Sequence, residues 1–283
     1  MVRIIISKFG NVNEKQVEWV IGVVKECYNK LSPHNVDVVD VYIFDSKWRF
    51  EAFMKNEALK FGVSSSGFGD SFFASHDAWT GLPRISVCLE LLNKLCLDAR
   101  LGGLRHEIAH SILHGSLNYY RLPMTMALME LGKKFNLNLQ YLTDLLYLLS
   151  VSVKDYEVTR FLYSKGYVVD QISYATHLLC SSKEEQLVWK LIRGDPNAEI
   201  LYLASLLKVL GCVKPLTKDA EFGDIITDLM RNYISHLPEF YLNALLKVVS
   251  CLDSLGTDTI ENLESLSSFF YEFVAKPIFK LYL

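Results

Sequence analysis

The strongest constraint on the fold is a change of pattern near residue 118. Before it, the β-branched runs VRIIIS (2–7) and VDVVDVYIFD (36–45) alternate with segments such as 13–31, whose apolar residues recur at helical spacing. After it, strand patterns fade and helical segments joined by turns continue. We therefore predict an α+β fold, with a small mixed β-sheet and helices in residues 1–118 and a mostly helical part in residues 119–283.

Helix ends and turns can also be located in residues 46–115. Residues 46–62 start with Ser46, a typical helix-capping residue, and stop at Gly62. A glycine- and serine-rich loop and two candidate strands around the turn TGLP (80–83) follow. The next segment is predicted to be helical through His114 and to end at Gly115.

Charge and cysteine usage exclude several classes of protein. The formal net charge of −3 and the absence of a Lys/Arg cluster give no basis for binding nucleic acid. The six cysteines form no CxxC pair, which favours reduced core residues over disulfides or a zinc ribbon. These cysteines are Cys27, Cys88, Cys96, Cys180, Cys212 and Cys251.

The apolar stretches indicate neither a signal peptide nor a membrane span. The apolar run at the N-terminus is short and lacks a small-residue cleavage site, which is typical of a strand. The stretches YLTDLLYLLSVSV and ILYLASLLKVLGCV are interrupted by Asp144 and Lys208 and fall short of the roughly 18–20 residues that a spanning helix needs. We expect a cytoplasmic protein with no membrane partner.

The motif HEIAH (106–110) predicts a metal site. Histidines at i and i+4 lie about 40° apart around a helix and one turn apart along it, so His106 and His110 can face one ion. Zinc accepts neutral imidazole, and a catalytic zinc needs three protein ligands plus an open position for water. Glu107 is rotated about 100° from His106, toward the expected side of that water, where it would act as general base and then acid.

A third ligand cannot come from the same helix. His114 lies about 12 Å along the axis from His106, so one ion cannot bind both. We expect His114 to stabilise the helix end or to support a ligand. A known three-histidine arrangement of metalloproteases would need histidine at 116, where the chain has Ser116.

Two glutamates compete for the third position. Glu130 lies off the apolar face of its helix, beside Lys133 and Lys134, as a solvated carboxylate does. Glu157 aligns with Val153 and Phe161 on the apolar side of its helix, where a carboxylate is costly unless it is paired or bound to metal. A buried pair with Arg160 or a neighbouring lysine is the alternative for Glu157. We predict Glu157 as the third ligand, with Glu130 as the fallback.

HEIAHSILHG together with DYEVTRFL (155–162) resembles the compact intracellular gluzincin-like metallopeptidases, a group that includes peptidases cleaving phage and stress-response repressors. The resemblance covers mainly residues 70–165. It implies a zincin-like N-terminal part, one Zn²⁺ bound by His106, His110 and Glu157, and Glu107 as the catalytic carboxylate. Such families often place an aspartate one turn after the third ligand to hold a histidine. Phe161 stands there in this chain, and Asp155 is the alternative.

The resemblance also implies how a peptide or protein substrate would bind. In these families a strand before the active-site helix pairs with the substrate backbone, and PRISVCLEL (83–91) and DSFFASHDAW (70–79) are equally candidates for this role or for an ordinary internal hairpin. Tyr163, Tyr167 and His177 are candidates for stabilising the oxyanion, and the sequence does not choose among them.

The main hypothesis is a zinc-dependent peptidase that uses a metal-activated water. The alternative is a non-catalytic, zinc-stabilised helical protein that regulates or binds a partner. In that case a fourth protein ligand would close the zinc site, with His76, His177 or a cysteine as candidates.

Overall fold

The strand patterns of the N-terminal part form one open, mixed sheet in the order β1-β2-β4-β3. β1 (Arg3–Phe9), β2 (Val38–Phe44) and β4 (Arg84–Cys88) run parallel, and β3 (Ala74–Asp77) pairs antiparallel with β4 at the edge. The computed structural model describes residues 2–62, 73–180 and 183–282, with the side chains of 183–186 left out. The predicted α+β class is confirmed.

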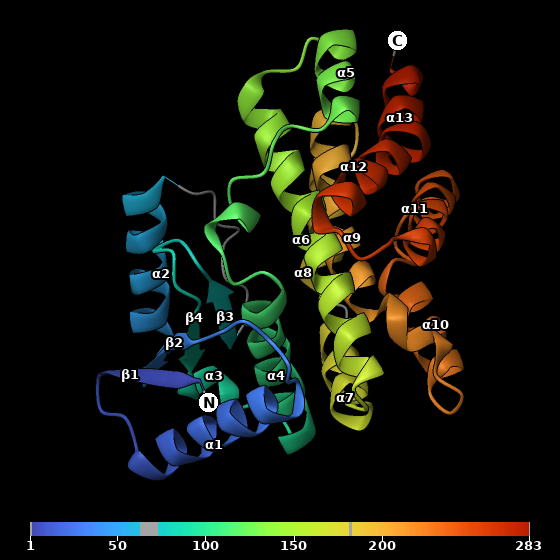
Figure 1. Cartoon of the computed structure of the whole chain (residues 1–283). Coiled ribbons are helices and arrows are strands. Elements are labelled where there is room, and N and C mark those ends of the chain that lie inside the picture. The colour runs from blue at the N-terminus through green and yellow to red at the C-terminus, as the bar shows by residue number, and fades with distance from the viewer. Residues whose placement is uncertain (1, 63–72, 181–182, 283) are drawn as a thin grey trace. The chain divides into compact units, whose positions relative to one another are not determined.

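The chain divides into two compact units, which are described separately. Unit 1 contains Met1–Leu122 and Phe161–His177, and Figure 1 shows its sheet in blue to teal. Unit 2 contains Pro123–Arg160 and Leu178–Leu283. The expected division at residue 118 therefore lies near the first boundary, but a later helical segment belongs with the sheet. The helices of unit 1 are α1 (Glu14–Lys30), α2 (Lys47–Phe61), α3 (Leu89–Leu92), α4 (Leu97–Leu113), the 3₁₀ turn η1 (Leu117–Tyr119) and α7 (Val169–Leu178, whose last residue is counted with unit 2).

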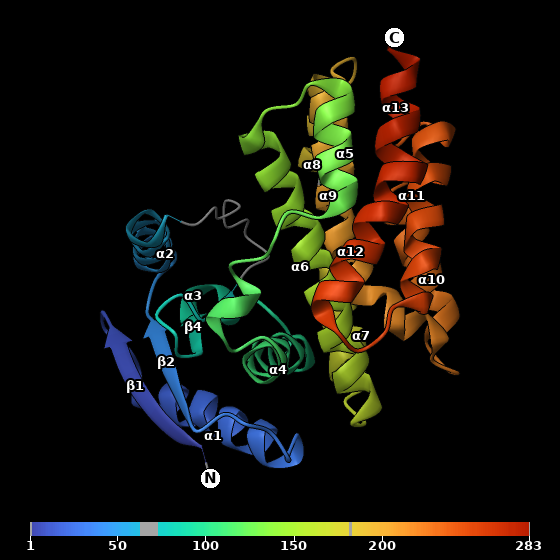
Figure 2. The same cartoon turned by 45° about the horizontal axis from the view of Figure 1, so that its top comes forward.

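The sheet of unit 1 is covered on both faces. On one face, the ring of Phe44 packs against Phe9 and against Phe50 of α2, with centroid distances of 4.5 and 5.6 Å. On the other face Val41 and Ile43 have 0% of their surface exposed. Figure 2 shows α1 and α4 on the opposite side of the strands from α2. α4 packs against β3, β4 and α1, so the helix with the HExxH motif lies directly on the sheet.

A buried ion pair joins the edge strand β3 to β4. Asp77 and Arg84 stand opposite each other in the register, and the Arg84 Nε donates to Asp77 Oδ2 at 2.9 Å. Arg84 also donates to Glu57 of α2 at 2.8 Å. Both members of the pair are almost fully buried, with 2% exposure for Arg84 and 1% for Asp77. The pair fixes β3 in place because neither charge can be buried alone without a large desolvation cost.

Unit 2 consists of helices around an apolar core. Glu199 in the first turn of α9 is 1% exposed, and its carboxylate accepts hydrogen bonds from the Gly194 N–H and the hydroxyls of Tyr241 and Tyr282. This buried carboxylate therefore ties α9 to α11 and to the end of the described chain. The elements of unit 2 are α5 (Met126–Phe135), α6 (Leu139–Ser164, in unit 2 through Arg160), α8 (Lys183–Ile192), α9 (Pro196–Val213), η2 (Lys214–Lys218), α10 (Gly223–Tyr233), α11 (Glu239–Cys251), η3 (Leu252–Ser254), α12 (Thr259–Phe270), the π-helical η4 (Tyr271–Ala275) and α13 (Lys276–Leu281).

One stretch is longer and more apolar than the sequence pattern indicated. Pro196–Lys218 has 23 residues and a mean hydropathy of 1.5, which by length and composition alone is enough to cross a membrane. In the structure 67% of its most apolar window is buried. A core helix has the same features, so this stretch is weak evidence for a membrane span.

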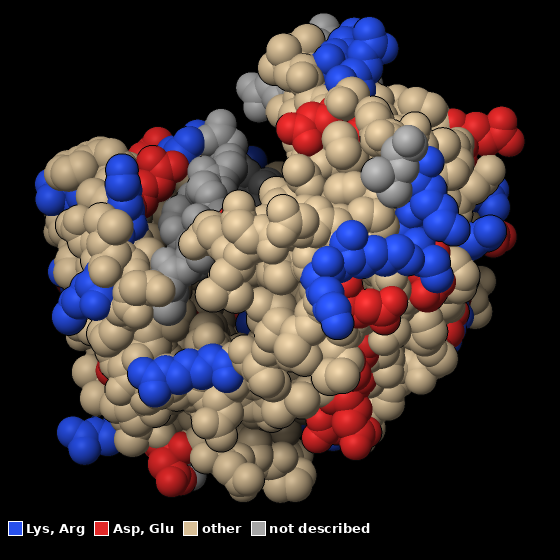
Figure 3. Space-filling view, turned by 90° about the horizontal axis from the view of Figure 1, so that it is seen from above, with Lys and Arg blue, Asp and Glu red and all other residues tan. Residues whose placement is uncertain are grey.

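Charged side chains of both signs are mixed over the surface that Figure 3 shows. Lys and Arg lie among Asp and Glu there, and broad uncharged areas separate these groups. On that face several Lys and Arg side chains adjoin one another, with Asp and Glu beside them.

The buried pair gives a stability prediction. Replacing Arg84 with Leu leaves Asp77 buried without its partner, so the free energy of unfolding should fall by about 3–5 kcal/mol. The matched control is Arg49→Leu, which breaks an exposed pair with Asp45 and should cost at most about 1 kcal/mol. Urea unfolding followed by circular dichroism measures both. Equal losses in the two variants would contradict the structural role of the Arg84 pair.

Candidate metal centre

The helix that carries the HExxH motif is held by an unusually close contact with α7. A Cβ atom at Gly102 would lie 2.2 Å from the carbonyl oxygen of Asp170, and one at Gly103 would lie 2.2 Å from the ring of Phe73. No side chain larger than hydrogen fits at either position. The two glycines thus let α7 approach α4 one turn before the histidines, and they bring the ring of Tyr174 to 5.7 Å from the ring of His106.

His106 and His110 face each other as their spacing predicts. Their Nε2 atoms are 3.1 Å apart, and the two side chains are only 3% and 9% exposed. Two imidazole nitrogens on one tetrahedral zinc ion, with bonds of about 2.0–2.1 Å, would be about 3.3 Å apart. The helix therefore holds this pair close to the separation that a shared zinc ion requires.

His114 contacts one of the pair. It follows the last residue of α4 as its C-cap, and its Nδ1 lies 3.2 Å from the Nδ1 of His110. The ring is 1% exposed. Its expected role, at the helix end or in support of a ligand, stays a prediction.

A second pair of rings lies on the other side of His110. His76 of β3 stacks on His110, with a centroid distance of 6.0 Å and an interplanar angle of 3°. The hydroxyl of Tyr120 lies 3.0 Å from the Nδ1 of His76. The edge strand and the loop after α4 therefore both contribute polar groups beside the motif. The strand stretch 70–79, one of the two candidates for binding a substrate backbone, includes β3, and its residues 70–72 lie outside the described part of the chain.

Glu107 is buried, with 9% of its surface exposed. It lies one residue after His106 on the same helix, as the general-base role requires. Its role in catalysis stays a prediction.

Unit 1 supplies two of the three expected ligands, since His106 and His110 have the spacing of a metal-binding pair. Asp155 and Glu157, the acidic residues of the second motif, lie on the part of α6 that belongs to unit 2. A carboxylate as third ligand therefore stays a prediction.

Glu157, the residue predicted as third ligand, is hydrogen-bonded inside unit 2. Its Oε1 accepts a hydrogen bond from Asn262 Nδ2 at 2.6 Å, and its Oε2 accepts one from the Thr259 hydroxyl at 2.7 Å. Glu157 is inward-facing as predicted, with 6% exposure, and contacts α12 of unit 2. Two residues of α-helix separate it from Asp155 by about 200°, so the two carboxylates cannot point the same way. The role of Glu157 as third ligand stays a prediction.

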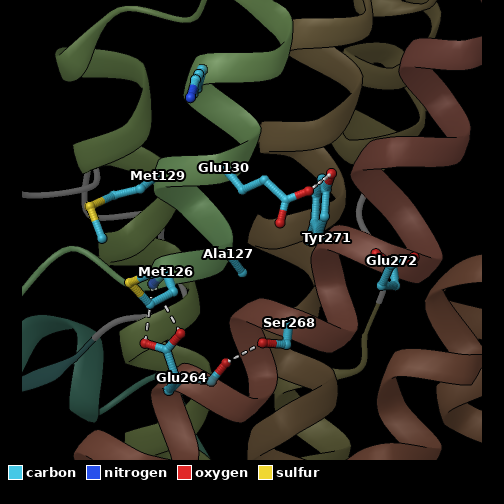
Figure 4. A pocket seen from close by; sticks show the side chains of 9 residues that line it. Met126, Ala127, Met129, Glu130, Glu264, Ser268, Tyr271 and Glu272 are labelled. Carbon is cyan, nitrogen blue, oxygen red and sulfur yellow. Dashed lines mark hydrogen bonds between the residues drawn. The ribbon is translucent and has the colours of Figure 1, made fainter.

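Glu130, the fallback ligand, also has a different hydrogen-bond partner. It lies in a hollow between α5 and the segment from α12 into η4, where its Oε1 accepts a hydrogen bond from the Tyr271 hydroxyl at 2.8 Å (Figure 4). Glu264 in the same hollow accepts from the Met126 N–H at the start of α5. Both carboxylates therefore stabilise helix contacts inside unit 2.

Tyr167, one of the residues proposed to stabilise the oxyanion, makes a different hydrogen bond. Its hydroxyl donates to Glu26 Oε1 at 3.0 Å, and Arg105 lies over its ring at 4.5 Å. Tyr174, which the sequence analysis did not single out, is the tyrosine brought beside His106. The glycine pair at 102–103 is the signal that would have indicated a helix crossing there.

The cysteines are core residues only in part. Cys27, Cys88 and Cys212 are buried as expected, whereas Cys96 and Cys180 are exposed and Cys251 is partly exposed. Burial raises the pKa of the Cys27 thiol to about 12. A thiol with so high a pKa is a poor metal ligand and nucleophile.

No protein-family model matches the chain, and no curated protein or solved structure is similar to it. The gluzincin resemblance therefore rests on its two short motifs. We therefore infer the function of the site from its own residues.

The close contact of α4 with α7 can be tested by stability. Gly102→Ala forces a Cβ into the Asp170 carbonyl, so we expect a loss of about 1–3 kcal/mol in the free energy of unfolding. Gly22→Ala is the matched control, because Gly22 is also mid-helix and its Cβ would meet nothing within 4 Å. This control should be neutral or stabilising by up to about 1 kcal/mol. If both variants gain stability in urea unfolding, the contact at Gly102 is not as tight as described.

Proposed function

We propose that this chain is a metal-dependent peptidase that binds one zinc ion through His106 and His110, with a carboxylate as the expected third ligand, and uses Glu107 as general base. The observation that carries the proposal is the buried histidine pair of α4, whose Nε2 atoms are 3.1 Å apart. Both histidines come from the HExxH motif, which also supplies a glutamate next to the first ligand.

The donor set fits zinc in a hydrolytic site. Two neutral imidazoles and one carboxylate are a common ligand set of catalytic zinc. Two histidines and one carboxylate also bind Fe²⁺ in non-haem oxygenases, so the metal content has to be measured. Glu107 favours zinc and hydrolysis, because a buried carboxylate one residue from a ligand is what proton transfer from an attacking water requires.

The proposed roles of the side chains follow from this geometry. When bound, zinc supplies a Lewis acid for the peptide carbonyl and lowers the pKa of a water. Glu107 takes the proton from the attacking water and then delivers it to the leaving amine nitrogen. Its burial keeps bulk water from competing for that proton. His76, stacked on His110, adds a polar group beside the reacting carbonyl.

A catalytic zinc centre and a structural one differ in the number of protein ligands. Structural zinc sites are usually closed by four protein ligands, and catalytic sites leave one position for water. A zinc-stabilised protein without catalytic activity is the competing function, and the experiment below separates the two.

The substrate class we propose is an extended peptide that pairs with β3. This strand is at the edge of the sheet, so one of its sides has no neighbouring strand in the described sheet. β-strand addition reads peptide backbone with little preference for sequence. Because β3 carries His76, whose ring stacks on His110, a peptide paired to β3 would lie beside the metal-binding histidines.

The first test measures zinc content and peptide hydrolysis in wild type, Glu107→Gln and His106→Ala. Glu107→Gln should keep one zinc per chain and lose about 10²–10⁴-fold in turnover of internally quenched decapeptides, because it removes only the proton carrier. His106→Ala should lose both zinc and activity. Metal analysis by mass spectrometry also identifies zinc or iron.

Glu18→Gln, on the exposed face of α1, is the control and should behave as wild type. Full activity of Glu107→Gln would overturn the mechanism. A wild-type protein that binds zinc stoichiometrically but hydrolyses no peptide in the library would favour the zinc-stabilised interaction protein.

The second test concerns Glu157, the predicted third ligand. Glu157→Gln should lower the free energy of unfolding by about 1–3 kcal/mol, because Thr259 and Asn262 lose a charged acceptor. As a zinc ligand, Glu157 should also lose more zinc affinity on substitution than the roughly 10–100-fold typical of an outer-shell loss. Competition with a fluorescent zinc chelator and urea unfolding measure the two effects, with Asp155→Asn as the comparison on the same helix. Unchanged zinc affinity in Glu157→Gln would exclude Glu157 as the ligand.

A further inference from the structure

The three histidines of α4 form a chain of ring-nitrogen contacts. His106 Nε2 lies 3.1 Å from His110 Nε2, and His110 Nδ1 lies 3.2 Å from His114 Nδ1. Both nitrogens of His110 are thus engaged, one toward the first metal-binding histidine and the other toward the helix end. His110 is therefore the ring whose proton position decides whether the metal site can form.

A neutral imidazole carries one proton and one lone pair on its two nitrogens. His110 can bind a metal through Nε2 only if its proton sits on Nδ1. That proton needs an acceptor, and the Nδ1 of His114 lies within hydrogen-bond distance. We propose that His114 is a positioning residue, which accepts the Nδ1–H of His110 and so keeps the Nε2 lone pair directed at the metal. The inference rests on the proposed metal site.

The backbone at the helix end explains how His114 reaches this place. His114 leaves the helical conformation at φ −127° and ψ 21°, while its own N–H still donates to the His110 carbonyl at 2.7 Å. The chain then turns so tightly that a Cβ at Gly115 would lie 2.0 Å from the Ser111 carbonyl oxygen. Glycine at 115 thus allows the turn that sets His114 against His110.

Packing holds the His114 ring in this orientation. It is 1% exposed, and Tyr119 of η1 contacts it edge to face at a centroid distance of 5.1 Å. Because packing already fixes the His114 ring, directing its Nδ1 at His110 costs no further side-chain freedom. Metal-binding histidines commonly have such a partner for the other ring nitrogen, usually a carboxylate or a carbonyl. In this chain a histidine takes that place.

The test uses metal-free full-length protein labelled with ¹⁵N and long-range ¹H–¹⁵N spectra that assign the tautomer of His110. In wild type the proton of His110 should lie on Nδ1. In His114→Phe, which keeps a ring but removes the acceptor, we expect a shift toward the Nε2–H form. Zinc affinity should fall about 10–100-fold in the same variant. In His114→Gln, whose side-chain oxygen accepts a hydrogen bond, we expect most of the zinc affinity to return.

His34→Phe is the control, because His34 contacts the Tyr28 carbonyl in unit 1 and neither histidine of the metal-binding pair in the described hydrogen bonds. It should leave the His110 tautomer and the zinc affinity unchanged. A wild-type His110 with its proton on Nε2, or unchanged zinc affinity in His114→Phe, would overturn the inference. If wild type binds no metal, the proposed function fails, and the tautomer still reports separately on the His110–His114 contact.

Discussion

The close approach of α4 and α7 is the contact on which the candidate site depends. Gly102 exposes its carbonyl to α7, and the buried Gln171 side chain donates to that carbonyl at 3.0 Å. Nearby on the same helix, Arg105 donates to Asp170 at 3.0 Å. A buried amide and an ion pair thus fix how α4 is rotated about its own axis. That rotation decides where the rings of His106 and His110 point, because both side chains leave the helix from one face.

The part of the site that lies within one helix could be predicted from the sequence. The i, i+4 spacing of His106 and His110 already implied that their nitrogens meet, and the rise of the helix excluded His114 as a joint ligand with His106. The strand patterns around the TGLP turn likewise gave β3 and β4 as an antiparallel pair. These are local features, in which neighbouring residues determine the geometry. The sequence could not predict that β3 lies at the sheet edge and brings His76 to His110.

The surroundings of Glu157 could not be predicted because α6 is buried around much of its circumference. Val153, Lys154, Glu157 and Val158 are all buried, although they point in different directions around the helix. The apolar neighbours of Glu157 therefore indicated correctly that it faces inward. They could not indicate which part of the interior it faces. The deciding information lies about a hundred residues away, in Thr259 and Asn262, which supply the two donors that Glu157 needs.

Glu157 shows what it costs to use a buried carboxylate as a metal ligand. It is held by two neutral donors and has both oxygens occupied, so releasing it to a metal would leave buried donors unpaired. Glu157 could bind an ion only if the ion offset the loss of both hydrogen bonds. Metal binding at this residue would therefore be coupled to the contact between α6 and α12.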